Sequence, residues 1–265
     1  MCYLVPLMSS AITLSVTDRV AVISGGSRVI GAATVRMFVQ AGARVVFNYQ
    51  KARDAADSLV SECGPQRCAA VRADLHDSQS ARALISAAVE RFGALDILVA
   101  NHGIWPPEDV PIDQMSERQW RDSIAINLDS VFGLVKHAVG QMKKQARGGH
   151  LVLVSSTAGQ RGEAFHCDYA ATKGAVISMV KGLATELAPD RIYVNCVAPG
   201  WVDTDMAAPA LTTAEARDRV LRTIPLRRIA TTAEIAAPIL FLCTEHAGFI
   251  TGEIFNVNGG AVLVG

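Results

Sequence analysis

Short β-branched runs alternate with longer segments of helical period along almost the whole chain. This alternation predicts repeated βαβ units, in which right-handed crossovers place helices on both faces of a parallel sheet. The expected strands cover residues 20–24, 44–48, 69–73, 97–100, 151–155, 192–197 and 253–257. The expected helices cover residues 32–41, 52–62, 78–92, 117–144, 169–187 and 233–243. We therefore expect an α/β fold with a doubly wound parallel sheet of about seven strands.

No internal repeat or boundary interrupts the alternation, so residues 18–265 are expected to form one domain. Residues 1–17 form an apolar, uneven extension without a basic start. Their apolar run is shorter than the ~20 residues that span a membrane, and Met8 would serve equally well as the start of the chain. We expect a loose or strand-like extension on a cytoplasmic protein that has no membrane segment.

The charges of the chain balance, because 25 basic side chains face 25 acidic ones among 265 residues. A net charge of zero offers no field for nucleic acid or for an anionic membrane, so neither is expected as a partner. The six cysteines are scattered without C-x-x-C pairs or metal-ligand spacing. They are expected to be free thiols in a reducing compartment, and no metal site is expected.

A glycine-rich loop that reads S-G-G-S-R-V-I-G follows the first expected strand and leads directly into a helix. Glycines allow the backbone to turn tightly and to approach a pyrophosphate, whose charge then lies at the N–H groups of the helix start. The loop stands at the first strand-to-helix turn, where a dinucleotide-binding fold requires it. Contacts to the dinucleotide are expected from Gly25, Ser27, Ile30 and Gly31.

Ser156, Tyr169 and Lys173 follow the expected strand at 151–155, at the sheet edge where an open α/β fold places its reacting groups. Tyr169 and Lys173 are four residues apart and share one face of a helix. A nearby ammonium favours the phenolate, so Lys173 is expected to lower the tyrosine pKa towards neutral pH. The set predicts a tyrosine acid–base catalyst, with Ser156 holding the same substrate oxygen.

The glycine loop, these three residues and several later segments resemble the short-chain dehydrogenase/reductase family from residue 18 to residue 260. The resemblance implies a Rossmann-type fold and a nicotinamide cofactor. The family's loop usually reads T-G-x-x-x-G-x-G, and Val29 stands where the second glycine is usual. If φ is positive there, a β-branched residue is strained by about 1–3 kcal/mol. We expect weaker dinucleotide binding than a glycine would give.

The second expected strand ends without the acidic residue that bonds the ribose hydroxyls of NAD. Arg28 stands where NADP-preferring relatives carry a base. The resemblance therefore implies NADP(H) in preference to NAD(H), with Arg28 and Asn48 contacting the 2′-phosphate. The alternative is that Arg28 is an ordinary solvated surface arginine.

The resemblance also implies roles for residues elsewhere in the chain. Asn127 would complete a catalytic tetrad by holding a water in a proton relay that reaches Lys173. Further cofactor contacts are implied for Asp74, Leu75, Asn101, Gly103, Tyr169, Lys173, Pro199, Gly200, Val202 and Thr204. The family's N-N-A-G segment reads A-N-H-G here, and His102 is expected to be structural because no carboxylate or second ligand accompanies it.

Three aromatic side chains fall on turns at the expected carboxyl edge of the sheet. Trp105, His166 and Trp201 are therefore candidates to line the substrate cavity. Residues 203–224 are expected to form either a lid over the cleft or a connecting helix.

These features predict reversible hydride transfer between a nicotinamide and a carbonyl or secondary alcohol. The pattern is similar to β-ketoacyl carrier-protein reductases, which implies a 3-oxoacyl thioester substrate, while sugar, steroid and small-alcohol dehydrogenases share the same motifs. A weakly active or non-catalytic dinucleotide-binding or sensing protein is a further alternative, favoured by Val29 and Ala100 and opposed by the intact Tyr169 and Lys173. The resemblance also implies a homotetramer.

Overall fold

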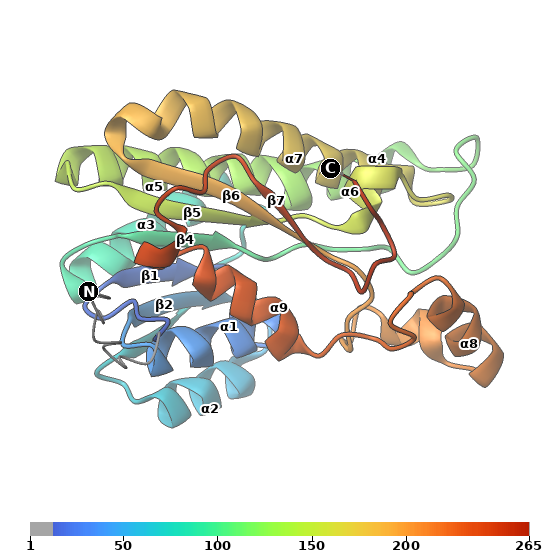
Figure 1. Ribbon diagram of the computed structural model, residues 1–265, viewed down its shortest axis with the longest axis horizontal. Coiled ribbons are helices and arrows are strands. Elements are labelled where there is room, and N and C mark those ends of the chain that lie inside the picture. The colour runs from blue at the N-terminus through green and yellow to red at the C-terminus, as the bar shows by residue number, and fades with distance from the viewer. Residues whose placement is uncertain (1–12, 265) are drawn as a thin grey trace, which may run out of the picture.

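Seven parallel strands in one sheet form the centre of the computed structural model, which describes residues 13–264 (Figure 1). The strands are β1 Val20–Ile23, β2 Arg44–Tyr49, β3 Cys68–Arg72, β4 Ile97–Ala100, β5 Gly149–Val154, β6 Ile192–Pro199 and β7 Ile254–Val257. Their order is β3-β2-β1-β4-β5-β6-β7. The chain runs outward from β1 to β3 and then returns to β4 on the other side of β1. This reversal makes the crevice between β1 and β4 the expected ligand position.

Helices cover both faces of the sheet. The helices are α1 Val29–Gln40, α2 Arg53–Cys63, α3 Ser78–Phe92, α4 Glu117–Ile124, α5 Ser130–Gln145, α6 Thr157–Arg161, α7 Cys167–Leu187, α8 Ala214–Arg222 and α9 Thr232–Phe241. Short 3-10 turns cover Ala188–Asp190, Ala208–Leu211 and Glu245–Ala247. The expected α/β fold, with its doubly wound seven-stranded parallel sheet, is confirmed.

The side chains of β1 show how one strand serves two cores. Val20 and Val22 pack with residues of α3, α5 and α7, whereas Ala21 and Ile23 pack with residues of α1, α2 and α9. Because successive side chains of a strand point to opposite faces, a strand buried on both faces is apolar throughout. Figure 1 shows the two helical layers on either side of the sheet.

The single helix expected over residues 117–144 is interrupted by a π-helical turn at Ala125–Asp129, which separates α4 from α5. Asn127 lies within this turn and is fully buried. Its amide donates to the Ile104 carbonyl at 2.9 Å and accepts from the Ile104 N–H at 2.8 Å. A π-helical turn inside an α-helix is frequent at functional sites, and here it brings a polar side chain against the end of β4.

Residues 203–224, expected to be a lid or a connecting helix, contain the 3-10 turn Ala208–Leu211 and helix α8. This part of the chain projects beyond the sheet, at the right of the view (Figure 1). Arg28 and Asp205 tie it to the glycine loop through an ion pair of 3.0 Å. The segment is therefore more helical than its composition indicated, and a lid movement stays a prediction.

The last residues of the expected extension pack against the domain. Val16 is buried, and its N–H donates to the Ala41 carbonyl at 3.0 Å. The rest of the expected extension, including Met8, lies outside the described residues. Among the helices found in residues 13–264, none combines the length and the apolar character that a membrane span needs.

Candidate active site

A cavity of about 700 Å³ opens at the carboxyl ends of the central strands. It brings together most of the side chains that the sequence singled out. Its walls include Gly25, Ser27, Arg28, Ile30, Asn48, Asp74, Leu75, Asn101, Gly103, Trp105, Ser156, Tyr169, Lys173, Pro199, Gly200, Trp201, Val202 and Thr204. Gly31, Asn127 and His166 do not belong to its lining. The sequence order therefore predicts one site, and the fold assembles it from the carboxyl ends of six strands, β1 to β6.

The glycine loop has the shape that a pyrophosphate requires. Gly25 has a φ of +63°, and a Cβ placed on Gly31 would lie 2.0 Å from the Gly25 carbonyl oxygen. Helix α1 begins directly after Arg28, whose side chain makes no capping hydrogen bond, and no acidic residue occupies its first turn. No side chain of the cap residue or acidic group of the first turn therefore occupies the N–H groups at this helix start, and an anionic phosphate fits them.

Val29 adopts a φ of +43°, in the region that favours glycine. Its side chain is 38% exposed and lines the cavity. Val29 would be strained if its φ were positive, and the structure meets this condition. A β-branched residue stands in a left-handed conformation at the first position of α1. The loop keeps its form in spite of this residue.

Asn48 has a different immediate task from the one expected. Its Oδ1 accepts from the Gly25 N–H at 2.8 Å, and its Nδ2 donates to the Ala73 carbonyl at 3.0 Å. The buried amide therefore holds the glycine loop against β2 and β3. Its direct contact with a 2′-phosphate stays a prediction.

The far end of the cavity carries two cations, Arg28 and Lys51, on exposed side chains. Asp74 lies near Lys51, and its pKa is lowered by the His76 N–H, by the Gln50 side chain and by the charges of His76 and Lys51. Lys51 follows the second strand closely, and the sequence did not single it out as a cofactor contact. Its position after the strand was the available signal.

Ser156, Tyr169 and Lys173 lie together on one wall of the cavity. Ser156 caps α6 by accepting from the Ala158 N–H at 3.1 Å, and its hydroxyl is one of the groups that lower the pKa of Tyr169. Tyr169 and Lys173 are both buried on α7. Lys173 Nζ lies 5.7 Å from the centre of the Tyr169 ring and donates to the Val154 carbonyl at 3.0 Å.

Burial controls the ionisation of this pair. It raises the pKa of Tyr169 to about 12, although the Ser156 hydroxyl acts in the opposite direction, and the charge of Glu163 raises it further. Burial also lowers the pKa of Lys173 to about 8. The expectation that Lys173 lowers the tyrosine pKa is therefore wrong, because burial dominates the ionisation of Tyr169 and Lys173 is not among the groups that shift its pKa. Tyr169 is a neutral acid at neutral pH.

Gly103 brings Asn127 and Lys173 close to each other. A Cβ on Gly103 would lie 3.0 Å from Asn127 Oδ1 and 3.3 Å from Lys173 Nζ. Both polar groups thus reach the same point of the backbone after β4. This proximity is compatible with the expected relay between them, and the water itself stays a prediction.

His102 joins two elements as a neutral ring. Its Nδ1 lies 2.7 Å from Ser24 Oγ and its Nε2 lies 2.6 Å from Ser130 Oγ. Burial lowers the pKa of His102 to about 4, so the imidazole is uncharged at neutral pH. The ring ties the end of β1 to α5, which agrees with the structural role expected for it.

The segment after β6 presents free backbone groups to the cavity. Val202 pairs with Ala230 in a parallel bridge whose two hydrogen bonds run from the Asp203 N–H and to the Trp201 carbonyl. Neither bond uses the N–H or the carbonyl of Val202; the carbonyl accepts from Thr204 Oγ1, which leaves the N–H and one carbonyl lone pair for an amide ligand. Thr204 Oγ1 lies 3.3 Å from the Val202 carbonyl, beside these groups.

The substrate side of the cavity holds Trp105 and Trp201, whose rings meet edge to face at 6.5 Å. His166, expected to line the same cavity, is buried against Trp105 at 4.6 Å between ring centres and lies 3.2 Å from Asp109. It is held behind the wall because it precedes α7 and packs on the indole. Glu163 does line the cavity, and the sequence did not single it out.

The glycine loop leads into a helix start without a side-chain cap, and the buried tyrosine and lysine lie on the wall of the same cavity. Together these features define a nicotinamide-dependent oxidoreductase of the α/β class. A family model described as "Enoyl-(Acyl carrier protein) reductase" matches residues 25–262. The chain belongs to the short-chain dehydrogenase/reductase family.

Relatives with different printed activities match the chain over most of its length. It is 36% identical to a 3-oxoacyl-[acyl-carrier-protein] reductase of Staphylococcus aureus, over 92% of this chain and 98% of the relative. It is 35% identical to an L-rhamnose 1-dehydrogenase (NAD(P)(+)) of Azotobacter vinelandii, over 92% of this chain and 96% of the relative. A solved short-chain dehydrogenase/reductase from Brucella melitensis, titled glucose/ribitol dehydrogenase, superposes with a TM-score of 0.87 at 35% identity, covering 96% of this chain and 100% of that one.

Proposed function

We propose that this oxidoreductase transfers hydride reversibly between NADP(H) and a carbonyl or secondary alcohol, with Tyr169 as the proton donor in reduction. The observation that carries the proposal is that Ser156, Tyr169 and Lys173 lie together on the wall of the cavity that also holds the glycine loop. A protein that only binds a dinucleotide has no need of this set. The alternative of a non-catalytic binder is therefore the weaker one.

When bound, the nicotinamide supplies or accepts the hydride. The neutral Tyr169 gives its proton to the carbonyl oxygen in reduction, and Ser156 donates a hydrogen bond to the same oxygen. The Val154 carbonyl holds the ammonium of Lys173 in place, which leaves two N–H groups for ribose hydroxyls. Asn127 supports a relay through water towards Lys173. In oxidation Tyr169 acts as the base, and its raised pKa opposes this direction in the absence of further positive charge.

NADP(H) is proposed over NAD(H) because Arg28, in the glycine loop, and Lys51, after the second strand, place two cations on the lining of the cavity. Arg28 is paired with Asp205, and their side chains are 62% and 69% exposed. An exposed pair of this kind contributes about 0–1 kcal/mol, so a doubly charged 2′-phosphate can replace the carboxylate.

Two substrate classes enter the proposal. The 3-oxoacyl thioester follows from the reductase relatives, whose printed activity concerns an acyl carrier protein. A hydroxylated carbonyl or alcohol follows from the relative named as an L-rhamnose dehydrogenase. The shared catalytic residues do not separate these classes, so the side chains around the substrate position must do so.

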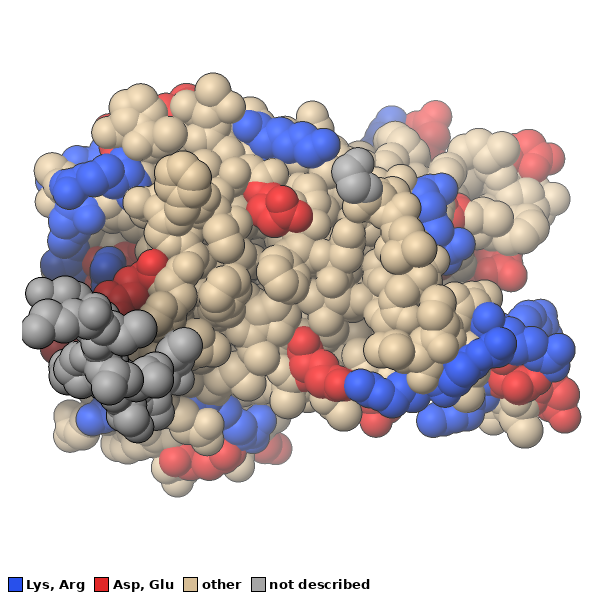
Figure 2. Space-filling view, viewed as in Figure 1, with Lys and Arg blue, Asp and Glu red and all other residues tan. Residues whose placement is uncertain are grey.

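We further propose a homotetramer in a reducing, cytoplasmic environment. Phe132 on α5 is 56% exposed, and Leu263 at the end of the chain is 88% exposed. The face that carries the chain end has few charged side chains over its middle (Figure 2), as suits burial between subunits. The five cysteines among the described residues are free thiols.

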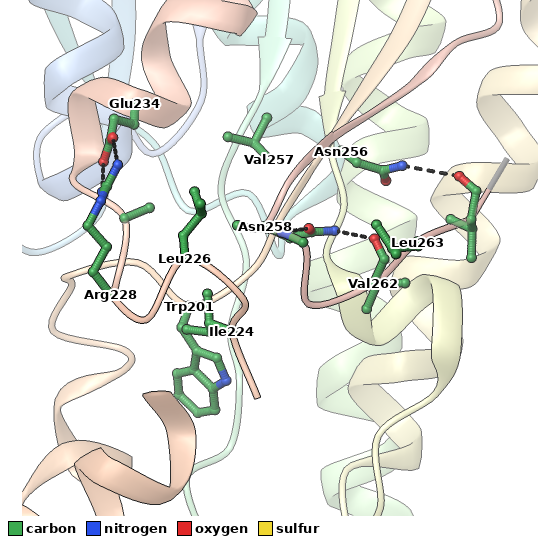
Figure 3. A pocket seen from close by; sticks show the side chains of 14 residues that line it. Trp201, Ile224, Leu226, Arg228, Glu234, Asn256, Val257, Asn258, Val262 and Leu263 are labelled. Atoms are coloured by element: carbon green, nitrogen blue, oxygen red, sulfur yellow. Dashed lines mark hydrogen bonds and ion pairs between the residues drawn. The ribbon is translucent and has the colours of Figure 1, made fainter. Parts of the chain in front are cut away.

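A second cavity of about 630 Å³ lies beside the chain end and shares Trp201 with the first (Figure 3). Ile224 and Leu226 line it together with Val262 and Leu263. The largely apolar lining supports the view that the chain end takes part in a subunit contact. Sedimentation equilibrium of the wild type and of a Leu263→Asp variant would test the tetramer.

The catalytic proposal is tested by NADPH oxidation with a panel of ketones that includes an acetoacetyl thioester. Tyr169→Phe should abolish turnover while NADPH binding, measured by calorimetry, stays within about twofold of wild type. Tyr193→Phe is the matched control, because this tyrosine stacks on His150 outside the cavity and should leave turnover unchanged. Turnover retained by Tyr169→Phe would contradict the assignment.

A further inference from the structure

Glu163 places a carboxylate beside the reacting phenol. It belongs to the segment that joins α6 to α7, is half-buried, and lines the cavity together with Ser156 and Tyr169. Burial raises the pKa of Glu163, and its charge is one of the causes that raise the pKa of Tyr169. The carboxylate therefore lies close to the position where a substrate oxygen meets the tyrosine.

The carboxylate of Glu163 differs from the structural carboxylates of the protein. Asp168, also in this region, is fully buried and accepts from Ser123 Oγ at 2.7 Å and from Gln119 Nε2 at 3.3 Å, so it holds α4 to α7. Glu163 instead lines the cavity together with Trp105, and the indole N–H of Trp105 is one of the groups that lower its pKa. Its interaction partner thus belongs to the cavity wall, and the carboxylate faces the space that a substrate enters.

Groups that donate hydrogen bonds stand around this acceptor. The guanidinium of Arg161 at the end of α6 lines the same cavity, and its charge lowers the pKa of Glu163. Trp105 and Trp201 add two flat apolar surfaces that meet at an edge. The substrate side therefore combines an anionic acceptor, a cationic donor and aromatic faces within one wall.

The chemistry of this wall selects among substrate classes. An acyl chain would press methylene groups against a half-buried carboxylate and remove it from water without a hydrogen bond in return. A cationic substrate would be opposed by Arg161. A hydroxyl group both donates and accepts hydrogen bonds. Neighbouring hydroxyls of one substrate can therefore donate to Glu163 and accept from Arg161 at the same time, while the C–H groups of that substrate lie on the indole faces.

We propose that Glu163 is a specificity-determining residue that selects a polyhydroxylated carbonyl or alcohol, of the aldose or polyol kind, in place of a 3-oxoacyl thioester. Its carboxylate accepts from hydroxyl groups next to the reacting carbon and orients that carbon towards Tyr169. This inference rests on the proposed hydride-transfer function and names its substrate class.

The test compares two substrate sets on purified full-length protein. NADP+ reduction is measured with a panel of pentoses, hexoses and their polyols, and NADPH oxidation is measured with an acetoacetyl thioester and simple ketones. We expect wild-type kcat/KM to be highest for a hydroxylated substrate. Glu163→Leu should lower that value by about 10- to 100-fold, the size of one or two lost charge-assisted hydrogen bonds, and leave the thioester rate equal or raised.

Two further variants separate recognition from folding. Glu163→Gln keeps the size and one acceptor, so it should retain its thermal unfolding midpoint and show an intermediate loss, mainly in KM. Glu108→Gln removes a negative charge from the exposed loop near Trp105 without touching the cavity, and should behave as wild type.

The outcomes distinguish the two proposals. A wild type that prefers the acetoacetyl thioester, or a Glu163→Leu variant that treats both substrate sets alike, would overturn the role of Glu163 and leave hydride transfer standing. The absence of turnover with every member of both sets would contradict the proposed function itself.

Discussion

Replacing Val29 with glycine should stabilise the protein, because this residue stands at a φ of +43°. A side chain in the left-handed region costs about 1–2 kcal/mol, and β-branching adds to the strain. Glycine also has greater conformational freedom in the unfolded chain, and this offsets about 0.5–1 kcal/mol of the gain in the free energy of unfolding. The net expectation for Val29→Gly is a gain of about 1 kcal/mol in the free energy of unfolding, which raises Tm by about 2–4 °C in a domain of this size.

The same change should strengthen nucleotide binding. The Val29 side chain lines the cavity at the start of α1, where the phosphates are expected, and its removal widens that approach. We expect the Kd for NADPH to fall by about threefold to tenfold, measured by calorimetry alongside thermal unfolding.

Val29→Ala is the matched control for the strain argument. Alanine keeps a Cβ in the left-handed region and removes only the branching, so it should recover less stability than glycine. A Val29→Gly protein with unchanged Tm and unchanged Kd would refute the reasoning. An alanine variant as stable as the glycine variant would show that branching alone, and not the Cβ, strains the loop.

Other consequences can be measured in the same preparations. Gly31→Ala should abolish NADPH binding in calorimetry, since its Cβ would lie 2.0 Å from a carbonyl oxygen; retained affinity would disprove the loop geometry. Combining Arg28→Ala with Lys51→Ala should reduce the preference for NADPH over NADH in kcat/KM by about tenfold or more, whereas an equal loss with both would speak against a 2′-phosphate site. Wild-type stability should fall with acid between about pH 6.5 and 4, because His102 stays neutral when folded and takes up a proton when unfolded. In His102→Ala, the free energy of unfolding measured with urea should change less steeply with pH in this range, by ~1.4 kcal/mol per pH unit. An unchanged pH dependence would exclude His102 as the cause. The kcat/KM for carbonyl reduction should fall above about pH 8 as Lys173 loses its charge. Lys173→Arg should shift this decrease to higher pH, and identical pH profiles would argue against Lys173 as its origin.

The sequence predicted those parts of the site that depend on local rules. Strand and helix periods follow from covalent geometry, so the seven strands could be assigned to within two residues of their ends. The glycine loop and the Ser156, Tyr169 and Lys173 set each stand directly after a strand. Because parallel strands end at one edge of the sheet, their meeting in one cavity followed from order alone.

The tertiary structure decided what depends on packing between distant segments. The pair of Arg28 with Asp205 joins residues 177 positions apart, and no local period signals such a meeting. The π-helical turn at Asn127 arises because its amide bonds the backbone of Ile104 after β4, against the helical pattern of its own segment.

The ionisation of the catalytic pair was also a tertiary property. Spacing placed an ammonium one turn from the phenol and indicated a lowered tyrosine pKa, but burial raises the pKa of Tyr169 to about 12. Desolvation depends on every group that surrounds a side chain, and the neighbours of Tyr169 come from several elements. Sequence thus determined which groups gather at the sheet edge, and only the packed structure determined their charge and the carboxylate of Glu163 that faces them.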